Sequence, residues 1–222
     1  MPLIELATVR LHPSLSSNLT DSFTATWTRA CGLATSAANG VPFQLYHSID
    51  PTTEDVYYLV GGWQSGDDHI AFLSTPDAVA LAKSIGEYMT VALVRHVDGD
   101  ISALGQEDGG RPKRLRVTAY QVPESMIDNW ALKWNNSPFA STGAGGWDLS
   151  SSVQKQHKAF KQMGEATNSV AAFGGKDESG SKTWVWLESS GNRSEETERS
   201  QYPLEGFENI QAEVFEMKYV VG

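Results

Sequence analysis

The stretch YYLVGGWQSGDDHIAF, residues 57–72, joins a strand to a helix and decides the fold. Its first part, YYLV, is an aromatic and branched run of the kind that strands favour. After Trp63, the segment SGDD starts a helix, because Ser65 can cap its N-terminus and Asp68 follows three residues later. Trp63 and His69 therefore lie on either side of a strand-to-helix junction, where their rings either line a cleft or pack the corner.

The segments around this junction alternate between strand and helix patterns. Period-two alternation predicts strands, and apolar residues at helical spacing with capping signals predict helices. The expected strands are residues 3–11, 42–49, 55–63 and 90–97, and the expected helices are residues 20–39 and a segment over 65–89 that restarts at Thr75. The order is βαββαβ.

The same order returns after a polar, glycine-containing linker. The expected elements there are strands over 115–122, 169–176, 182–189 and 211–221, a helix over 123–136, and a polar helical or irregular segment over 195–206. An insertion near 136–164 contains the glycine-rich TGAGG (142–146), expected to form a lid, and a helix-like run with His157. We expect a first domain over residues 1–104, a linker over 105–113 and a second domain over 114–222.

This duplication predicts how the two units meet. A four-stranded antiparallel sheet with both helices on one face leaves its other face apolar and uncovered. Two such sheets in one chain can cover each other. The expected fold class is therefore α+β, with two tandem ferredoxin-like βαββαβ domains packed sheet to sheet as an intramolecular α+β barrel, either a monomeric pseudo-dimer or a homodimer.

Composition and charge exclude several classes of function. The 222 residues are 40% hydrophobic and 10% aromatic, as in soluble globular proteins. The net charge of -10 and the pI near 4.9 oppose binding to nucleic acid or to an anionic membrane surface. No segment has the apolar length needed to span a bilayer. The single cysteine, Cys31, fits a reducing compartment, so we expect a cytoplasmic protein.

The element order and the segment GGWQSGDDHIAF resemble the dimeric α+β barrel superfamily and, within it, the antibiotic biosynthesis monooxygenase domains of tandem, fungal type. The matching residues are Gly62, Trp63, Ser65, Asp68, His69 and Phe72. The second half matches only by element order, because TWVWLESSGNRSEETER has neither the Gly-Trp pair nor the histidine. The resemblance implies small-molecule chemistry in a cleft between sheet and helices. The family's activities include cofactor-free oxygenation of aromatic polyketides, haem degradation, and cyclisation or isomerisation of secondary metabolites.

Three residues are the candidates for catalysis. His69 lies in the first turn of its helix, where the dipole favours a neutral imidazole that can act as a general base, although Asp67 and Asp68 favour the protonated form. Trp63 can stack on a planar substrate and donate its indole N–H to an enolate. Tyr58 is a hydroxyl donor. Packing of the corner and of the core is the alternative role for each.

Six further residues are candidates for binding a hydrophobic substrate. They are Trp27, Tyr46, His47, Tyr57, Phe72 and Arg95. The aromatic residues can equally be core residues. His47 and Arg95 lie on expected strands, where a polar side chain needs a partner if it is buried.

The expected function is that of a tailoring enzyme of secondary metabolism. It would act on a hydrophobic, polycyclic or aromatic small molecule, by cofactor-free oxygenation or by proton-transfer-driven cyclisation or isomerisation. No His and carboxylate pair shows ligand spacing such as HxxxH, so we expect no metal site and no cofactor. Two alternatives stay open: a non-catalytic ligand-binding or stress-response protein, and a haem enzyme with one axial histidine.

Overall fold

A computed structural model describes residues 1–13, 21–104, 112–150, 180–190, 206–207 and 209–222. In the first half, the strands are β1 (Leu3–Leu11), β2 (Gln44–Ser48), β3 (Val56–Trp63) and β4 (Met89–Asp98), and the helices are α1 (Asp21–Ala37), α2 (Gly66–Leu73) and α3 (Pro76–Gly86). In the second half they are β5 (Arg114–Pro123), α4 (Ile127–Asn135), β6 (Gly143–Trp147), β7 (Ser181–Ser189) and β8 (Gln211–Val221). Short 3₁₀ turns lie at 51–53, 101–104, 124–126 and 138–141.

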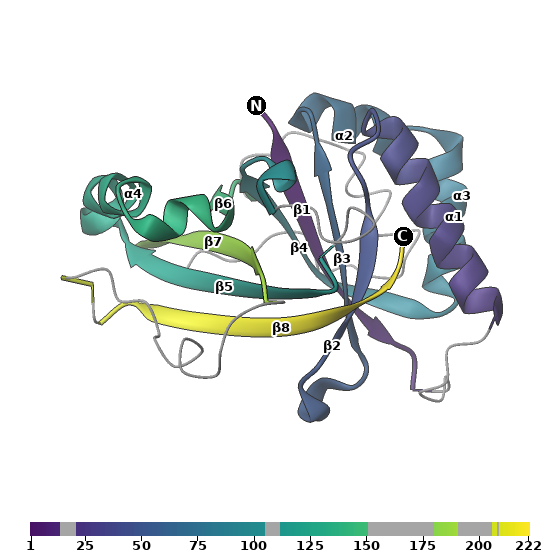
Figure 1. The fold of residues 1–222 in the computed structure, drawn as a ribbon. Helices are drawn as coiled ribbons and strands as arrows, with labels where there is room; N and C mark the ends of the chain where they lie inside the picture. The colour runs from purple at the N-terminus through teal and green to yellow at the C-terminus, as the bar shows by residue number, and fades with distance from the viewer. Residues whose placement is uncertain (14–20, 105–111, 151–179, 191–205, 208) are drawn as a thin grey trace.

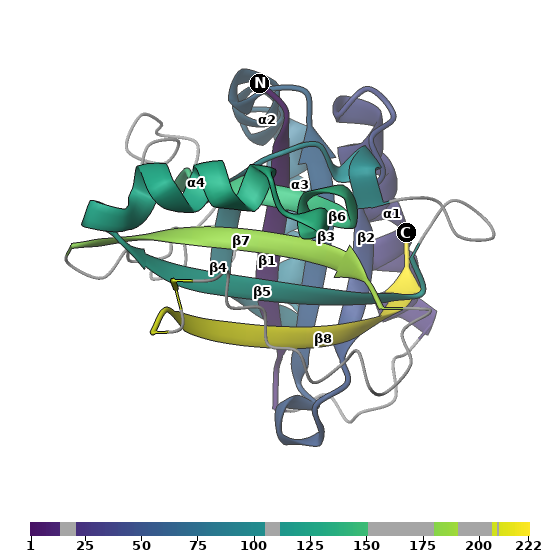
Figure 2. The same cartoon turned by 60° about the vertical axis from the view of Figure 1, so that its left-hand side comes forward.

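The strands form one eight-stranded sheet in the order β4-β1-β3-β2-β8-β5-β7-β6. Each half contributes four strands in the same relative order, with its first strand between its third and fourth, and neighbouring strands are antiparallel. In Figures 1 and 2 the strands of the two halves cross each other, and each half carries its helices on its outer side. The expected pair of ferredoxin-like halves is confirmed.

The inner faces of the two half-sheets pack against each other. Side chains at alternate positions of β1, β3, β5 and β7 make this core, which follows from the period-two geometry of strands. Its buried members include Ile4, Leu6, Tyr58 and Val60 from the first half and Leu115, Val117, Val185 and Leu187 from the second. The α+β barrel expected from the sequence is therefore present within one chain.

Two junctions close the barrel. On one side β2 pairs with β8, with Tyr46 opposite Tyr219. On the other side, Val97 at the end of β4 forms an antiparallel bridge with Asp148, just after β6. Glycines allow this close approach, because a Cβ on Gly146 would lie 2.3 Å from the carbonyl oxygen of Asp98.

The glycine-rich segment TGAGG is not a lid. Residues Gly143–Trp147 form strand β6, which pairs with β7. In this pairing Gly143 lies opposite Glu188, and Trp147 lies opposite Trp184. The other edge of β7 is occupied by β5, so β7 lies between the two strands β5 and β6. Strand propensity missed β6 because glycine disfavours strands; here Gly145 has φ +152 and lies so close to Val185 that no side chain fits. Residues 152–164 with His157, 169–176 and nearly all of 195–206 lie outside the described residues.

The helices cover the outer faces of the sheet. In Figure 1 α1, α2 and α3 lie on the outer side of β1–β4, and α4 lies on the outer side of β5 and β7. Their N-terminal signals act as expected: Ser65 and Thr75 accept hydrogen bonds from the backbone N–H groups of Asp68 and Ala78. Among the described residues, no helix combines the length and apolar character needed to cross a bilayer.

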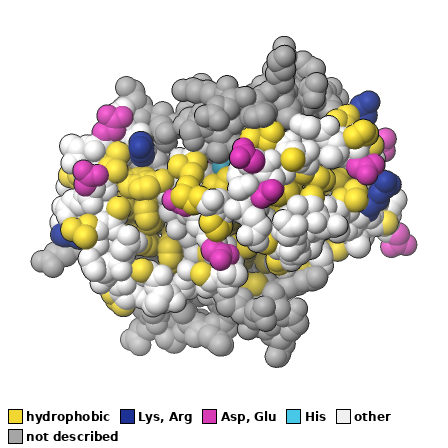
Figure 3. Space-filling view, turned by 90° about the horizontal axis from the view of Figure 1, so that it is seen from above, with side chains coloured by type: hydrophobic (Ala, Val, Ile, Leu, Met, Phe, Trp, Pro, Cys, Tyr) yellow, Lys and Arg dark blue, Asp and Glu magenta, His cyan; other side chains and the backbone are white. Residues whose placement is uncertain are grey.

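The face seen in Figure 3 mixes apolar and acidic side chains, and the basic ones among the described residues stand apart from one another. This distribution agrees with the negative net charge.

Candidate active site

A narrow apolar cavity lies between the first half-sheet and helices α1, α2 and α3. Its volume is about 120 Å³. Space remains there because small side chains face each other across the layer; these are Ala7, Ala30, Ala34, Ala78 and Ala82. The larger walls include Trp27, Trp63 and Phe72, and the ionisable side chains that line the cavity are Glu5 and His69. An apolar cavity of about 150 Å³ accepts benzene, so this one is of the size of a single small ring.

Glu5 of β1 joins the strand and the helix of the junction. Its Oε2 accepts a hydrogen bond from the indole nitrogen of Trp63 at 2.7 Å and lies 3.2 Å from Nε2 of His69. Both contacts use Oε2, so Oε1 is the carboxylate oxygen left for a ligand. The Glu5 side chain is 11% exposed, and it is among the residues that line the cavity.

His69 connects Glu5 to a second histidine. Its Nδ1 lies 3.0 Å from Nε2 of His96 on β4, where one ring donates a hydrogen bond and the other accepts it. Both imidazoles are buried, at 3% and 0% exposure. Glu5, His69 and His96 therefore form a continuous hydrogen-bonded chain across β1, α2 and β4.

Local structure fixes the direction of His69. Ser65 caps α2, and its hydroxyl donates to Asp68 Oδ2 at 2.8 Å, which orders the first turn. The ring of His69 stacks on Trp63 with centroids 4.6 Å apart and planes 11° apart. The imidazole is thus positioned by the helix cap and by an aromatic face, as the motif predicted, although Asp68 acts on the cap and not on the ring.

Burial decides the ionisation of this cluster. Burial lowers the pKa of His69 to about 3. Burial, with the nearby His69, lowers the pKa of His96 to about 4, so both rings are neutral at pH 7. Burial also raises the pKa of Glu5, against the opposing effects of His96 and of the Trp63 hydrogen bond. Among the described residues no Lys or Arg forms an ion pair with Glu5.

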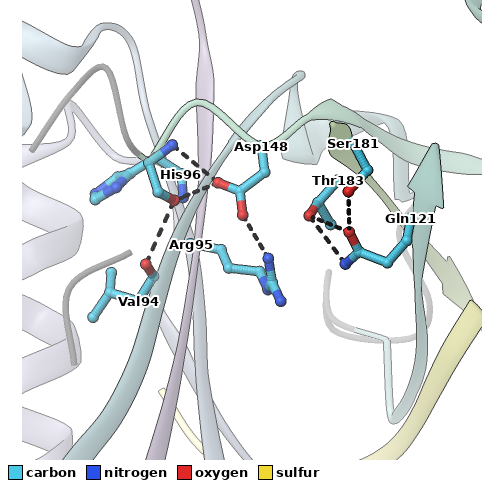
Figure 4. Close-up of polar contacts among 8 residues, drawn as sticks. Val94, Arg95, His96, Gln121, Asp148, Ser181 and Thr183 are labelled. Atoms are coloured by element: carbon cyan, nitrogen blue, oxygen red, sulfur yellow. Dashed lines mark hydrogen bonds and ion pairs between the residues drawn. The ribbon is translucent and has the colours of Figure 1, made fainter. Parts of the chain in front are cut away.

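A segment of the second half supports His96. The backbone N–H of His96 donates to Ser150 Oγ at 2.8 Å, and the Ser150 hydroxyl donates to Asp148. Asp148 also forms an ion pair with Arg95 at 2.6 Å. Figure 4 shows Arg95 and Asp148 pointing toward each other beside His96. The cluster of the first half is thus braced by residues of the second half.

The sheet divides the residues that the sequence singled out. Trp27, Trp63, His69 and Phe72 line the cavity on the helix side. Tyr46 and Tyr58 belong to the barrel core on the opposite side of the sheet, and Arg95 is held there by Asp148. Tyr57 packs on Phe23, and His47 stacks on Tyr57 and contacts the carbonyl oxygen of Glu54. Tyr58, Tyr46 and Arg95 thus lie on the face of the sheet opposite to His69, because adjacent strand positions point to opposite faces.

Sequence reasoning missed Glu5, His96, Asp148 and Ser150. The sequence does contain a signal for Glu5. Leu3, Ala7 and Val9 share one face of β1, and Glu5 falls in the same apolar phase. A carboxyl group in that phase must find partners when buried. No comparable signal marks Asp148 and Ser150, since their contacts depend on closure of the barrel.

Haem and a single metal ion differ in how they fit this site. A porphyrin does not fit a cavity of about 120 Å³. Haem ligation at this site therefore does not agree with its geometry. In contrast, Glu5, His69 and His96 each offer a ligand atom, and these atoms lie within 4.8 Å of one another. Two imidazoles and a carboxylate are a ligand set for a divalent transition-metal ion.

Comparisons with known proteins match the fold. No family model and no curated protein matches the chain. A proposed monooxygenase from Lactobacillus acidophilus NCFM superposes with a TM-score of 0.58 at 8% identity, covering 98% of this chain and 93% of that one. A proposed monooxygenase from Fusobacterium nucleatum gives 0.57 at 8% identity over 98% and 92%. A proposed chlorite dismutase gives 0.51 at 14% identity over 99% and 94%. These proteins therefore share the barrel of two halves within one chain.

Proposed function

We propose that the protein is a small-molecule enzyme that removes a proton from a hydrophobic substrate held in the cavity of the first half. The observation that carries the proposal is the hydrogen-bonded chain Glu5–His69–His96, which opens onto an otherwise apolar cavity through Glu5 and His69. A buried carboxylate with neutral imidazoles behind it is a base whose strength is increased by desolvation.

The reaction begins with transfer of a proton from a substrate C–H to the Glu5–His69 pair. The electron pair of that bond moves into an adjacent carbonyl of the substrate, which gives an enolate. The indole N–H of Trp63 donates a hydrogen bond to Glu5 Oε2. The direct role of Trp63 is therefore to position the base. Oxygenation, ring closure or isomerisation of the enolate follows, without a cofactor, in the manner expected of a tailoring enzyme in secondary metabolism.

The volume of the cavity narrows the substrate class. About 120 Å³ suits one ring with small substituents, whereas a polycyclic substrate would need α1 or α3 to move. We therefore propose a one-ring, enolisable hydrophobic molecule in place of the polycyclic one that the sequence suggested.

Deuterium exchange at carbon tests this function without knowledge of the natural substrate. Phenylacetone, a one-ring ketone with acidic C–H bonds, is incubated in D₂O with EDTA-treated protein, and loss of its α-proton signals is followed by NMR. Exchange should be catalysed by the wild type and abolished in His69→Gln, while binding of phenylacetone stays intact. Ala34→Leu, which fills the cavity, should abolish both binding and exchange.

Two outcomes contradict the proposal. Exchange by His69→Gln at the wild-type rate rejects His69 as part of the base. Binding of phenylacetone and other one-ring ketones without any exchange favours the non-catalytic binding protein.

A further inference from the structure

Among the residues that the structure describes, no Lys or Arg side chain pairs with the buried carboxyl group of Glu5. Glu5 is 8% exposed, and its carboxyl group contacts the indole nitrogen of Trp63 and Nε2 of His69. Arg95, the nearest guanidinium along β4, projects to the other face of the sheet and is paired with Asp148. A buried carboxylate without a counter-charge is costly, so the cluster is stabilised when it takes up a cation.

The geometry of the cluster suits a cation that binds several ligands. Glu5, His69 and His96 come from β1, α2 and β4, and their ligand atoms lie within 4.8 Å of one another. Glu5 Oε2 lies 3.2 Å from Nε2 of His69, and Nε2 of His96 lies 3.0 Å from Nδ1 of His69. Whichever nitrogen of His69 binds the ion, one of these two distances is therefore a separation between two ligand atoms. Ligand atoms bound to one zinc ion in a tetrahedron lie about 3.4 Å apart, which follows from bonds of about 2.1 Å. Small side-chain adjustments are enough to bring the three groups around one ion.

We propose that Glu5, His69 and His96 form a binding site for one divalent first-row transition-metal ion, of the zinc or iron(II) class. Two imidazole nitrogens and one carboxylate oxygen select such an ion over Mg²⁺ and Ca²⁺, which bind mainly oxygen ligands. His69 supplies one ring nitrogen and keeps the other for a hydrogen bond. Three protein ligands leave a position for water or for a small molecule on the cavity side.

Neighbouring residues supply the support that metal ligands need. Trp63 donates to Glu5 Oε2 and stacks on His69, so it orients two of the three ligands. Ser150 holds the backbone of His96 from the second half. The ion and a proton taken from a substrate would bind to the same atoms of Glu5 and His69. The metal-bound form and the proton-transferring form are therefore two alternative states of this site.

Titration with Co²⁺ tests the site without any substrate. Full-length protein is stripped with EDTA and dialysed, and Co²⁺ is added while visible absorption and tryptophan fluorescence are recorded. One Co²⁺ per chain should bind, with ligand-field bands of nitrogen and oxygen coordination and quenching of Trp63, which stacks on a ligand. Zn²⁺ added afterwards should displace Co²⁺ and remove the bands.

Matched variants assign the ligands. His96→Gln and Glu5→Gln keep side-chain volume and should weaken Co²⁺ binding by more than about tenfold, and Trp63→Phe should weaken it by about ten- to a hundredfold while the bands persist. His12→Ala removes a histidine of the same half that contacts the carbonyl oxygen of Gly86, and it should bind Co²⁺ as the wild type does. Circular dichroism checks that each variant is folded.

The inference is overturned if folded, stripped wild type binds no Co²⁺, or if both Gln variants bind it with wild-type affinity and bands. It stands independently of the proposed function. Carbon-acid exchange by the stripped protein without Co²⁺ binding refutes only the metal site, and Co²⁺ binding without such exchange refutes only the proton-transfer function.

Discussion

The outer layers of the two halves occupy equivalent places in the barrel and are filled in opposite ways. In the first half, alanines on β1, α1 and α3 leave a cavity, and Glu5, His69 and His96 form a polar chain beside it. In the second half, aromatic residues fill the layer between β5, β7 and α4; they are Tyr120, Trp130, Trp134, Trp184, Trp186 and Phe207. Equivalent backbone positions thus support a site in one half and a packed core in the other.

The aromatic layer of the second half is closely packed. The ring centroid of Trp134 lies 5.2 to 5.7 Å from the ring centroids of four neighbours, Tyr120, Trp130, Trp184 and Trp186. Within the described residues, the buried indole nitrogens of Trp130, Trp134, Trp184 and Trp186 have no hydrogen-bond partner. The comparison teaches that two half-sheets with the same strand order can differ completely in how the layer between sheet and helices is filled.

The largest effect is expected from Trp134→Ala. Removing a side chain that is 1% exposed should lower the free energy of unfolding by about 3–5 kcal/mol, because a large void replaces the indole. Phe72→Ala, at the wall of the existing cavity, should lower it by no more than about 3 kcal/mol. Urea unfolding measures both. A larger loss for Phe72→Ala would contradict the contrast between a filled and a hollow layer.

Asp148→Ala tests the brace between the halves. It leaves Arg95, whose side chain is 10% exposed, without its partner, and it removes the acceptor of Ser150, so a loss of about 3–5 kcal/mol is expected. Asp55→Ala is the control, since the Arg10–Asp55 pair is about half exposed and should contribute less than about 1 kcal/mol. Equal losses in the two variants would mean that the brace is not a buried ion pair in solution.

A smaller effect is expected at Glu5 in the metal-free protein. Glu5→Ala leaves the indole N–H of Trp63 without an acceptor and should cost about 1–3 kcal/mol of stability. Glu5→Gln keeps an acceptor oxygen and removes the buried charge, so it should change stability by less than about 1 kcal/mol. Thermal and urea unfolding of EDTA-treated protein distinguish the two, and a loss in Glu5→Gln as large as in Glu5→Ala would be contrary to this account.

The smallest effect concerns Tyr120 in the aromatic layer. Burial, with the charge of Glu188, raises the pKa of Tyr120 to about 12 from its ordinary value of 10.0. Between these two values the unfolded chain loses the Tyr120 proton and the folded chain keeps it, so this contribution to stability is complete below pH 10 and is lost as the pH rises to about 12. Denaturation at a series of pH values should show a shallower decline for Tyr120→Phe than for the wild type. Identical slopes would show that Tyr120 is solvated.

Much of the fold could be predicted because its signals are local. Strand β1 alternates with period two, β3 begins as an aromatic and branched run, and α2 begins at the Ser65 cap that the motif indicates. Strand β6 could not be predicted from propensity, since its glycines are needed for close approach to β7 and to Asp98. Half of the candidate site was predicted, Trp63 and His69, because both belong to one continuous motif.

The amino-acid sequence by itself determined the elements of the first half, strands β5, β7 and β8 with helix α4 in the second half, and the strand-to-helix corner, because caps, periodicity and turn residues act within a few positions of each other. Only the tertiary structure decided that Glu5, His69 and His96 meet, that Tyr58 and Arg95 turn away from them, and that Ser150 of the other half supports the cluster. These choices depend on strand register and barrel closure, which bring together groups far apart in the chain and remove them from water. That desolvation shifts the pKa values of Glu5, His69 and His96.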